Sequence, residues 1–459
     1  MDIPRAITPL LIEWKNNSDR KPLIIRGARQ VGKTHAVTSF GKKYFKHCFS
    51  LNFEKDRDYQ KLFETSQSIS KLLAELEVLS RLPITQGQTL VFFDEIQACP
   101  RAIELLRYFY EEAPQCPVIA AGSLLEFVLE KNISSFPVGR VTMRYMYPLS
   151  FEEYLLAEGE GKLLDYFHNL GFNDPAVDVI HEKSRQCLRH YLLLGGMPKV
   201  VHAYLTHKNL LQTEEQKQDL IQTFRDDFRK YGNRVNTDNL DIAFREAAHY
   251  MGQQFNYGQM GLDSRHQALQ ATGMLEKAML LRRVRPVQSV SFPLIPRKKS
   301  VSKIIFLDVG LAQFMSGISS EIIHSDNLSS VYKGGIAEQF VGQTLLTLVG
   351  THSHPELFFW QSQRKSAQSE IDFVYPYQAY LIPIEVKYGK GGALASLHQF
   401  MHQHKAPVAI RIYDGPLRYE TLKIHLPQNQ KAFSYRLLSL PLYLIHELPR
   451  FLTQVVAGI

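Results

Sequence analysis

The sequence predicts an α/β protein with more than one domain, and three observations lead to this prediction. The chain has 459 residues, which exceeds the usual size of a single domain. Between residues 23 and 146, short apolar runs suited to buried parallel strands alternate with amphipathic segments. From residue 303 onward a second series of the same kind begins. We therefore expect two α/β blocks, joined by a region with a different pattern.

The first block contains five apolar runs of strand length, at residues 23–25, 49–53, 90–93, 118–121 and 141–146. The second begins with a run at 304–307, continues with a helix from residue 336, and has strand patterns at 357–360, 371–375 and 380–386. These runs are short and bounded by turn residues, as strands in a covered sheet usually are.

The joining region is helical in its first part, from about residue 149 to 234, where β-branched runs are few. In residues 239–286 a helical pattern with Ala268, Ala271 and Leu275 on one face is followed by a strand pattern at 280–284. This order is typical of a winged helix, although a three-helix lid fits the pattern equally well. Residues 286–302 are polar and proline-marked, which indicates a connector or a long hairpin.

Composition limits the class of protein. The chain has 53 basic and 45 acidic residues, a net charge of +8, which is compatible with contact to DNA or RNA but does not require it. The four cysteines form no CxxC pair, so neither a disulfide framework nor a zinc knuckle is expected. The first residues lack a signal-peptide profile, and no run approaches the roughly 20 apolar residues that cross a bilayer. We expect a cytoplasmic protein without a membrane partner.

A phosphate-binding loop directly follows the first predicted strand. Gly27, Gly32, Lys33 and Thr34 match the G-x-x-x-x-G-K-[ST] pattern at every required position. The glycines allow backbone N–H groups to point at phosphate oxygens, the lysine neutralises β/γ-phosphate charge, and the threonine hydroxyl binds Mg²⁺. The residues expected to bind ATP are Gly27, Ala28, Arg29, Gln30, Val31, Gly32, Lys33, Thr34 and His35.

The third apolar run ends in two acidic residues, Asp94 and Glu95. Open α/β sheets bind ligands at the carboxyl ends of their strands, so these carboxylates are expected beside the phosphate loop. We predict that Asp94 helps to hold Mg²⁺ and that Glu95 orients or deprotonates the attacking water.

Two further residues are candidates for the same reaction. Ser123 ends the fourth run, where it either senses the γ-phosphate or is an ordinary strand exit. Arg140 precedes the fifth run and acts either as a finger toward a neighbour's nucleotide, in a homo-oligomer, or as a surface ion pair. Asp226 and Asp227 are interpreted as solvated helix positions.

These motifs resemble a family of prokaryotic AAA+-type ATPases that carry a C-terminal domain of unknown function. The resemblance covers nearly the whole chain, in segments 24–34, 92–97, 122–123, 139–141, 147–153, 194–198, 306–311 and 335–340. Ser123 stands where many AAA+ proteins carry Asn. The resemblance implies a RecA-like core with a parallel sheet, a helical lid, a winged-helix-like module and a C-terminal α/β domain like restriction endonucleases. The expected segments are 1–148, 149–238, 239–300 with its connector, and 301–459.

The last segment resembles the PD-(D/E)xK nuclease core, with Asp372 as the first acid and Glu385 and Lys387 as the second element. Glu385 and Lys387 are two residues apart and therefore share one face of a strand. Glu338, on a predicted helix, adds a further acid. We expect these four residues to form a Mg²⁺ cluster. The chain is then either an ATPase that binds or processes nucleic acid, or a nucleotide-dependent switch whose C-terminal domain is an inactive platform for protein partners.

Overall fold

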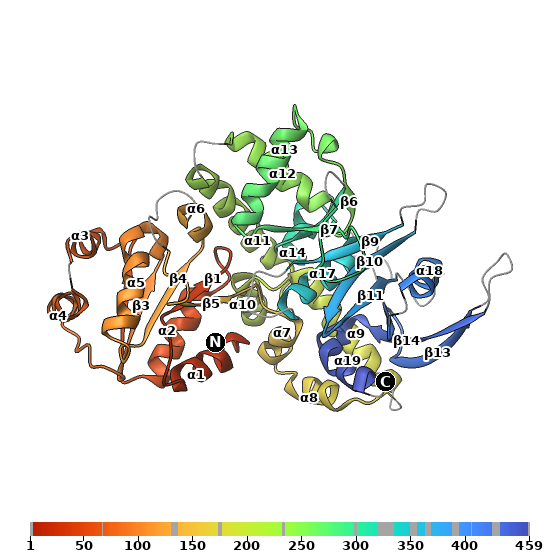
Figure 1. The fold of residues 1–459 in the computed structure, drawn as a ribbon, viewed down its shortest axis with the longest axis horizontal. Coiled ribbons are helices and arrows are strands. Elements are labelled where there is room, and N and C mark those ends of the chain that lie inside the picture. The colour runs from red at the N-terminus through yellow and green to blue at the C-terminus, as the bar shows by residue number, and fades with distance from the viewer. Residues whose placement is uncertain are drawn as a thin grey trace.

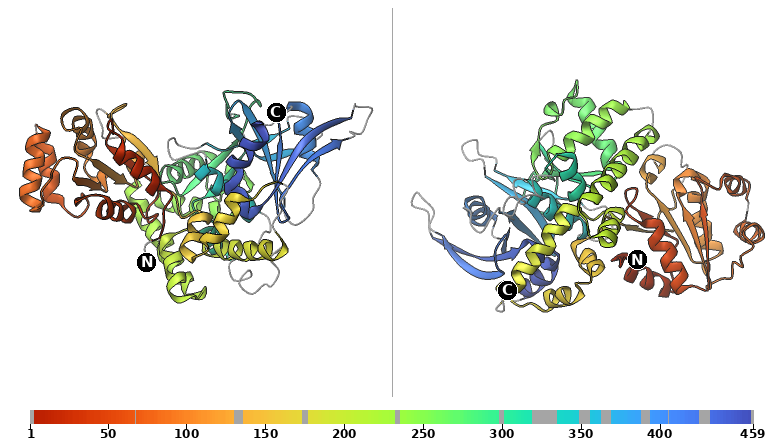
Figure 2. Two further views of the ribbon diagram at one scale, coloured as in Figure 1. Left: turned by 90° about the horizontal axis from the view of Figure 1, so that it is seen from below. Right: turned by 180° about the vertical axis from the view of Figure 1, so that it is seen from behind.

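The structure is a computed structural model. It describes residues 3–66, 68–129, 136–172, 177–231, 235–297, 301–318, 335–348, 356–362, 369–387, 394–404, 406–424 and 432–457. Figure 1 shows the N-terminal sheet at one end of the molecule, the C-terminal sheet at the other, and helices between them. The views in Figure 2 show the same order of parts.

The first block is a five-stranded parallel sheet in the order β2-β3-β4-β1-β5. Its strands are β1 (Leu23–Arg26), β2 (His47–Asn52), β3 (Thr89–Asp94), β4 (Val118–Gly122) and β5 (Thr142–Tyr145). All five predicted runs are therefore confirmed as strands. Alternate residues of β3 pack into different clusters, Leu90 and Phe92 on one face and Val91 and Phe93 on the other. Covered faces on both sides explain the continuous apolar runs.

Six helices surround this sheet in the part of the block that the structure describes. They are α1 (Ile7–Asn16), α2 (Lys33–Tyr44), α3 (Arg57–Thr65), α4 (Ile69–Ser80), α5 (Pro100–Glu112) and α6 (Leu125–Leu129). Residues of α1 and α2 pack in one hydrophobic cluster with Phe92, whereas residues of α3, α4 and α5 pack in the other with Phe93.

The predicted helical region is confirmed, and its helices α7–α11 are called the lid below. They are α7 (Phe151–Glu158), α8 (Gly161–Asn169), α9 (Asp178–Leu194), α10 (Pro198–His207) and α11 (Leu211–Asp227). α7 begins with a capping box in which Ser150 and Glu153 satisfy each other's backbone N–H groups. α9 ends at Gly195, whose φ of 75° is a conformation that residues other than glycine seldom adopt.

The next segment runs helix, strand, helix and hairpin. Its elements are α12 (Thr237–His249), β6 (Gln254–Phe255), α13 (Arg265–Lys277), β7 (Leu281–Pro286) and β8 (Ser302–Phe306). β8 pairs antiparallel with both β6 and β7. The order matches the one expected for a winged helix, and that identification stays a prediction. The expected segment boundary at residue 300 falls between the two paired strands β7 and β8.

The C-terminal strands continue the sheet that β6, β7 and β8 begin, because β7 pairs in parallel with β9. The nine strands lie in the order β13-β14-β12-β11-β10-β9-β7-β8-β6. The additional strands are β9 (Phe358–Gln361), β10 (Glu370–Tyr377), β11 (Tyr380–Val386), β12 (Ala409–Tyr413), β13 (Arg418–Ile424) and β14 (Phe433–Pro441). The sequence pattern did not predict this continuity, since it depends on which edges meet.

Four helices complete the described part of the C-terminal block, α14 (Val309–Met315), α17 (Gly335–Leu348), α18 (Ala395–His404) and α19 (Leu448–Ala457). The α/β character of the block is confirmed, and its identity as a restriction-endonuclease-like fold stays a prediction. One hydrophobic cluster runs from Ile7 through the lid to Val455, so the lid is packed against both sheets. None of the helices that the structure describes is long and apolar enough to cross a membrane.

Candidate functional site

The phosphate loop lies between β1 and α2, and its glycines stand where side chains would not fit. A Cβ on Gly27 would lie 2.3 Å from the Met146 carbonyl oxygen. Gly32 has a φ of +93°, the left-handed region that disfavours other residues. α2 begins at Lys33, so its unpaired N–H groups and positive dipole end face the loop. These features fit a bound phosphate group.

Lys33 is buried inside the loop. Its Nζ donates to the carbonyl oxygens of Gly27, at 2.9 Å, and Ala28, at 2.8 Å. Burial lowers the pKa of Lys33 to about 8, although the nearby charges of Glu95 and Asp94 act in the opposite direction. A partly desolvated ammonium held by neutral carbonyls keeps an unneutralised charge for an anionic ligand.

Asp94 ends β3 beside the first turn of α2. The Thr34 hydroxyl donates to its carboxylate at 3.1 Å, and Asn52 Nδ2 donates to Oδ2 at 3.0 Å. Burial, and then the charge of Glu95, raise the pKa of Asp94. The hydroxyl and carboxylate oxygens are of the hard type that Mg²⁺ prefers, so these residues fit the predicted metal. Asn52 was missed by the sequence reasoning.

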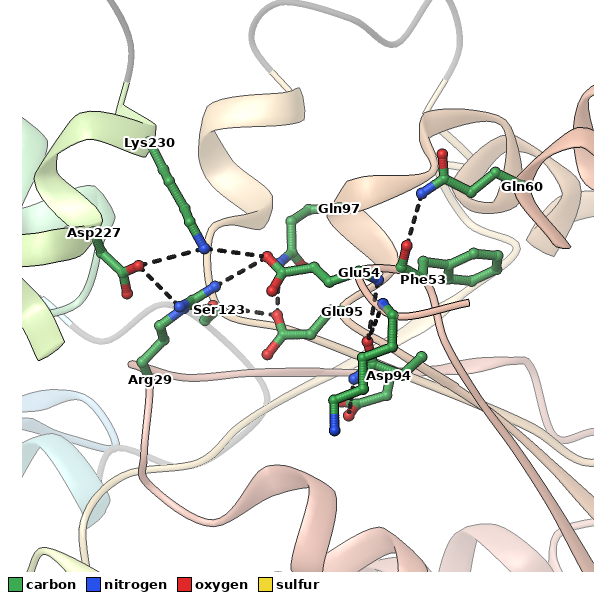
Figure 3. Close-up of polar contacts among 12 residues, drawn as sticks. Arg29, Phe53, Glu54, Gln60, Asp94, Glu95, Gln97, Ser123, Asp227 and Lys230 are labelled. Atoms are coloured by element: carbon green, nitrogen blue, oxygen red, sulfur yellow. Dashed lines mark hydrogen bonds and ion pairs between the residues drawn. The ribbon is translucent and has the colours of Figure 1, made fainter. Parts of the chain in front are cut away.

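Glu95 is held by two neighbours. Gln97 Nε2 donates to its Oε2 at 2.6 Å, and the Ser123 hydroxyl approaches the same oxygen at 3.5 Å. Glu95 itself has a φ of 50°. A non-glycine residue in this conformation is uncommon, and here it aims the side chain across the strand end toward Ser123 (Figure 3). The structure thus brings the predicted residues Glu95 and Ser123 together.

Arg29 connects the phosphate loop to the lid. Its Nη1 lies 2.9 Å from Asp227 Oδ1 and its Nη2 lies 3.0 Å from Glu54 Oε1. Lys230 approaches the same two carboxylates, at 3.5 and 3.6 Å (Figure 3). The interpretation of Asp227 as solvated is wrong: it is 4% exposed, because it continues the buried face of α11 that carries Leu220 and Phe224.

Lys33, Thr34, Asp94 and Glu95 all border one cavity of about 600 Å³. The cavity is also lined by residues from the N-terminus, from the segment before α7 and from α10, namely Ile3, Arg5, Leu149, Pro198, Lys199 and His202. Of the predicted nucleotide-binding residues, Arg29, Gln30, Gly32 and His35 also border the cavity, whereas the Val31 side chain packs in the core.

Arg5, which borders the cavity, connects three segments of the chain, and the sequence reasoning did not predict a role for it. Its guanidinium donates to the carbonyl oxygens of Val31, at 2.8 Å, and Tyr147, at 2.7 Å, and it lies 3.0 Å from Glu153 Oε1. One nearly buried arginine therefore joins the phosphate loop, the segment after β5 and the first helix of the lid.

Arg140 is the one predicted catalytic residue that lies apart from this group. Its Nε donates to Glu111 on α5 at 2.9 Å, and its side chain is 45% exposed. A role toward a neighbouring chain stays a prediction.

The lid is interlocked with the C-terminal block by Asp308, at the start of α14. The buried Asp308 carboxylate accepts the backbone N–H of Gly196 at 2.6 Å and of Leu311 at 3.0 Å. Burial raises its pKa to about 6, against the effect of these hydrogen bonds. A Cβ on Gly195 would lie 2.0 Å from Asp308 Oδ1, which explains why this position is a glycine. Gly196 also accepts from the Leu149 N–H, next to the cavity.

The predicted C-terminal residues lie near one another on β10, β11 and α17. Asp372 Oδ2 accepts the Val386 N–H at 2.8 Å, beside Glu385, and Lys387 Nζ lies 2.5 Å from Glu385 Oε1. Burial, and then the charge of Asp372, raise the pKa of Glu385 to about 7.

The cation among these acids is a lysine that the sequence reasoning missed. Lys303 Nζ, from β8, lies 2.7 Å from Glu338, 2.5 Å from Glu370 and 2.9 Å from Asp372. Across the described residues, no group of three or more His, Cys, Asp or Glu is arranged to hold a metal ion. As they stand, these residues do not fit the Mg²⁺ cluster that the sequence predicted.

Two arginines of the basic run after α13 share one carboxylate within the chain, that of Glu276. Arg283 contacts Glu276 through its side chain, at 2.5 Å, and its own N–H, at 3.0 Å, and Arg282 lies 3.7 Å from the same carboxylate. Glu276 accordingly has a lowered pKa in spite of its burial. Glu276 therefore offsets part of the positive charge of these two arginines.

Comparison with known families divides the chain into three matched parts. An AAA domain family matches residues 19–155, a domain of unknown function (DUF8612) matches 185–322, and a second domain of unknown function (DUF4143) matches 333–430. The first match agrees with the sequence motifs, and residues 19–155 are called the AAA-type domain below. A comparison with curated proteins finds no match.

Solved structures give only a distant likeness. PCH-2 from C. elegans is 12% identical with a TM-score of 0.26, covering 44% of this chain and 59% of that chain. A signal transduction ATPase with a tetratricopeptide repeat sensor, from Pyrococcus horikoshii, is 13% identical with a TM-score of 0.28, covering 76% and 46%. The ORC2 protein of Aeropyrum pernix is 13% identical with a TM-score of 0.21, covering 69% and 92%. The chain thus spans less than two thirds of the first two proteins, and TM-scores this low indicate nothing further about it.

Proposed function

We propose that the chain hydrolyses ATP with Mg²⁺ at the cavity between the AAA-type domain and the lid. The observation that supports this most is that Lys33, Thr34, Asp94 and Glu95 all border one cavity. A phosphate-binding lysine, a hydroxyl–carboxylate pair and a second carboxylate are the groups that phosphoryl transfer requires.

Each of these residues has its own task in the proposal. Lys33 leaves the carbonyl oxygens of Gly27 and Ala28 and turns to the β/γ-phosphates. Thr34 and Asp94 would hold Mg²⁺, which neutralises phosphate charge when bound. Glu95, kept in place by Gln97 and Ser123, orients the water and accepts its proton.

We further propose that the adenine and ribose lie between the AAA-type domain and the lid, near Leu149 and Pro198. Both residues border the cavity, and Leu149 is bonded to Gly196, which Asp308 holds. A change in nucleotide state would thereby reach the C-terminal block. Arg29, which contacts Asp227 on α11, provides a second connection between the phosphates and the lid.

We make two alternative proposals for the C-terminal block: it binds DNA or RNA, or it is a platform for protein partners. Assembly of the chain into a homo-oligomer also stays a proposal. Two observations favour the platform. Lys303 is enclosed by the acids that a nuclease would use for metal, and Arg282 and Arg283 are paired with Glu276.

The test is ATP binding and turnover by the full chain with Mg²⁺. Lys33→Ala should abolish binding, whereas Glu95→Gln should keep binding and reduce turnover about 100-fold or more, the usual effect of losing a general base. Glu75→Gln, which removes a carboxylate on the surface of α4, is the control and should behave as the wild type. Undiminished turnover in Glu95→Gln would remove that residue from the reaction, and absence of turnover in the wild type would refute the proposal.

A further inference from the structure

Lys303 stands in an unusual place for a lysine. It lies on β8, all of whose residues are buried, and its side chain is only 3% exposed. Lysine is seldom buried to this extent unless its charge is paired, because removing an ammonium from water is costly. Its position therefore requires partners, and they come from α17 and β10.

The ammonium has a partner for each donor. An ammonium offers three N–H groups, and Lys303 has three carboxylates within 2.9 Å, those of Glu338, Glu370 and Asp372. Nζ also lies 5.6 Å from the centre of the Phe359 ring. Each of the three carboxylate contacts is an ion pair, so the charge of this buried lysine has its partners within the chain.

Two of the three acids have a partner on their other oxygen as well. Asp372 gives Oδ1 to Lys303 and Oδ2 to the Val386 N–H, at 2.9 and 2.8 Å. Glu370 gives Oε1 to Lys303 and Oε2 to Gln254. A divalent ion held by both Asp372 and Glu370, with ligands at roughly 2.1 Å, would need these same oxygens and would have to displace the ammonium.

We infer that Lys303 is the resident cation of the C-terminal carboxylate cluster and takes the place that a divalent metal would occupy. The ion pairs join β8, α17 and β10, so the cluster fastens the β7–β8 hairpin to the strands beyond it. The C-terminal block therefore binds no metal at Asp372 and cuts no phosphodiester bond there. This inference does not depend on ATP hydrolysis.

The experiment measures Mn²⁺ binding to the full chain without nucleotide, by titration calorimetry and electron paramagnetic resonance. The variants are Lys303→Ala, Asp372→Asn, the two changes combined, and Lys387→Ala as the control. Lys387 is a nearby lysine that forms an ion pair with Glu385 and with none of the three acids around Lys303. We expect the wild type and Lys387→Ala to lack a site that depends on Asp372. Lys303→Ala should gain one Mn²⁺ site, at least tenfold tighter than any in the wild type, that Asp372→Asn abolishes.

Two results would overturn the inference. One is a Mn²⁺ site in the wild type that Asp372→Asn removes, and the other is a folded Lys303→Ala that gains no site. If Lys303→Ala does not fold, the test compares Mn²⁺ binding and nucleic-acid cleavage by the wild type and by Asp372→Asn. Equal, weak Mn²⁺ binding by both, with no Mn²⁺-dependent cleavage of DNA or RNA by the wild type, supports the inference, and binding or cleavage lost in Asp372→Asn refutes it.

Discussion

Two of the buried lysines in the described part of the chain, Lys33 and Lys303, lie near carboxylates in opposite arrangements. Lys33 lies against the neutral carbonyl oxygens of Gly27 and Ala28, while Asp94 and Thr34 contact each other at the cavity. Lys303 lies directly among Glu338, Glu370 and Asp372. In the first arrangement the positive and negative groups are kept apart, so both remain available to a phosphate and its metal. In the second the ammonium and the three carboxylates are in direct contact.

The difference shows that residue types alone do not define a metal site. Both sites contain the acids and the lysine that phosphoryl or phosphodiester chemistry uses. What separates them is whether the lysine has neutral or charged partners, since an ammonium in ion pairs leaves little charge for a ligand.

The largest expected effect is on the free energy of unfolding when Lys303 is removed from its three acids. Lys303→Met should lower the free energy of unfolding by about 3 kcal/mol, because the buried Asp372 and two partly buried acids would lose their cation. Lys387→Met should cost about 1 kcal/mol or less, since this lysine has one partner and is 25% exposed. Denaturant unfolding of both variants measures the difference. Equal losses would mean that Lys303 is not the centre of the cluster.

A smaller effect is expected on protease cleavage of α11, where Asp227 contacts Arg29 of the phosphate loop. Asp227→Asn removes the carboxylate shared by Arg29 and Lys230, which should loosen α11 and speed protease cleavage within residues 211–231 about tenfold, or about 1.4 kcal/mol. Asp226→Asn is the matched control, because its exposed carboxylate contacts only Gln222 among the described residues. Faster cleavage in both variants would indicate a general loss of helix stability instead.

The smallest effect concerns pH and the interlock at Asp308. Its pKa in the folded chain is about 6, against 3.8 for an ordinary Asp, so the folded state holds the proton more tightly than the unfolded state. The contribution of this group to stability therefore falls as pH rises from about 4 to 6. The loss of stability in Asp308→Asn should shrink by about 1 kcal/mol between pH 5 and pH 7.5. A loss that grows with pH over this range would contradict the assignment.

The nucleotide site could be predicted because its signals are local. The phosphate loop and the end of β3 are contiguous motifs with fixed spacing, and the five apolar runs placed their strands. The sheet of the N-terminal block is therefore confirmed, and Lys33, Thr34, Asp94 and Glu95 lie at one cavity, while their roles stay a proposal.

The remaining features depend on residues far apart in the chain. Lys303 is 69 residues from Asp372, and Arg29 is 198 residues from Asp227, so no spacing reveals either contact. A signal for Asp227 did exist, because it follows Leu220 and Phe224 on the buried face of α11. No feature of the sequence indicated that β7 pairs with β9, because the apolar pattern of a strand is the same whichever neighbour it pairs with.

The most direct test of the contrast between the two lysines is the number of Mn²⁺ ions bound per chain with a non-hydrolysable ATP analogue at saturation. One ion should bind the wild type, at Thr34 and Asp94, and none should bind Lys33→Ala, which cannot hold the nucleotide. Two ions per chain in the wild type, or one ion that persists in Lys33→Ala, would contradict the account.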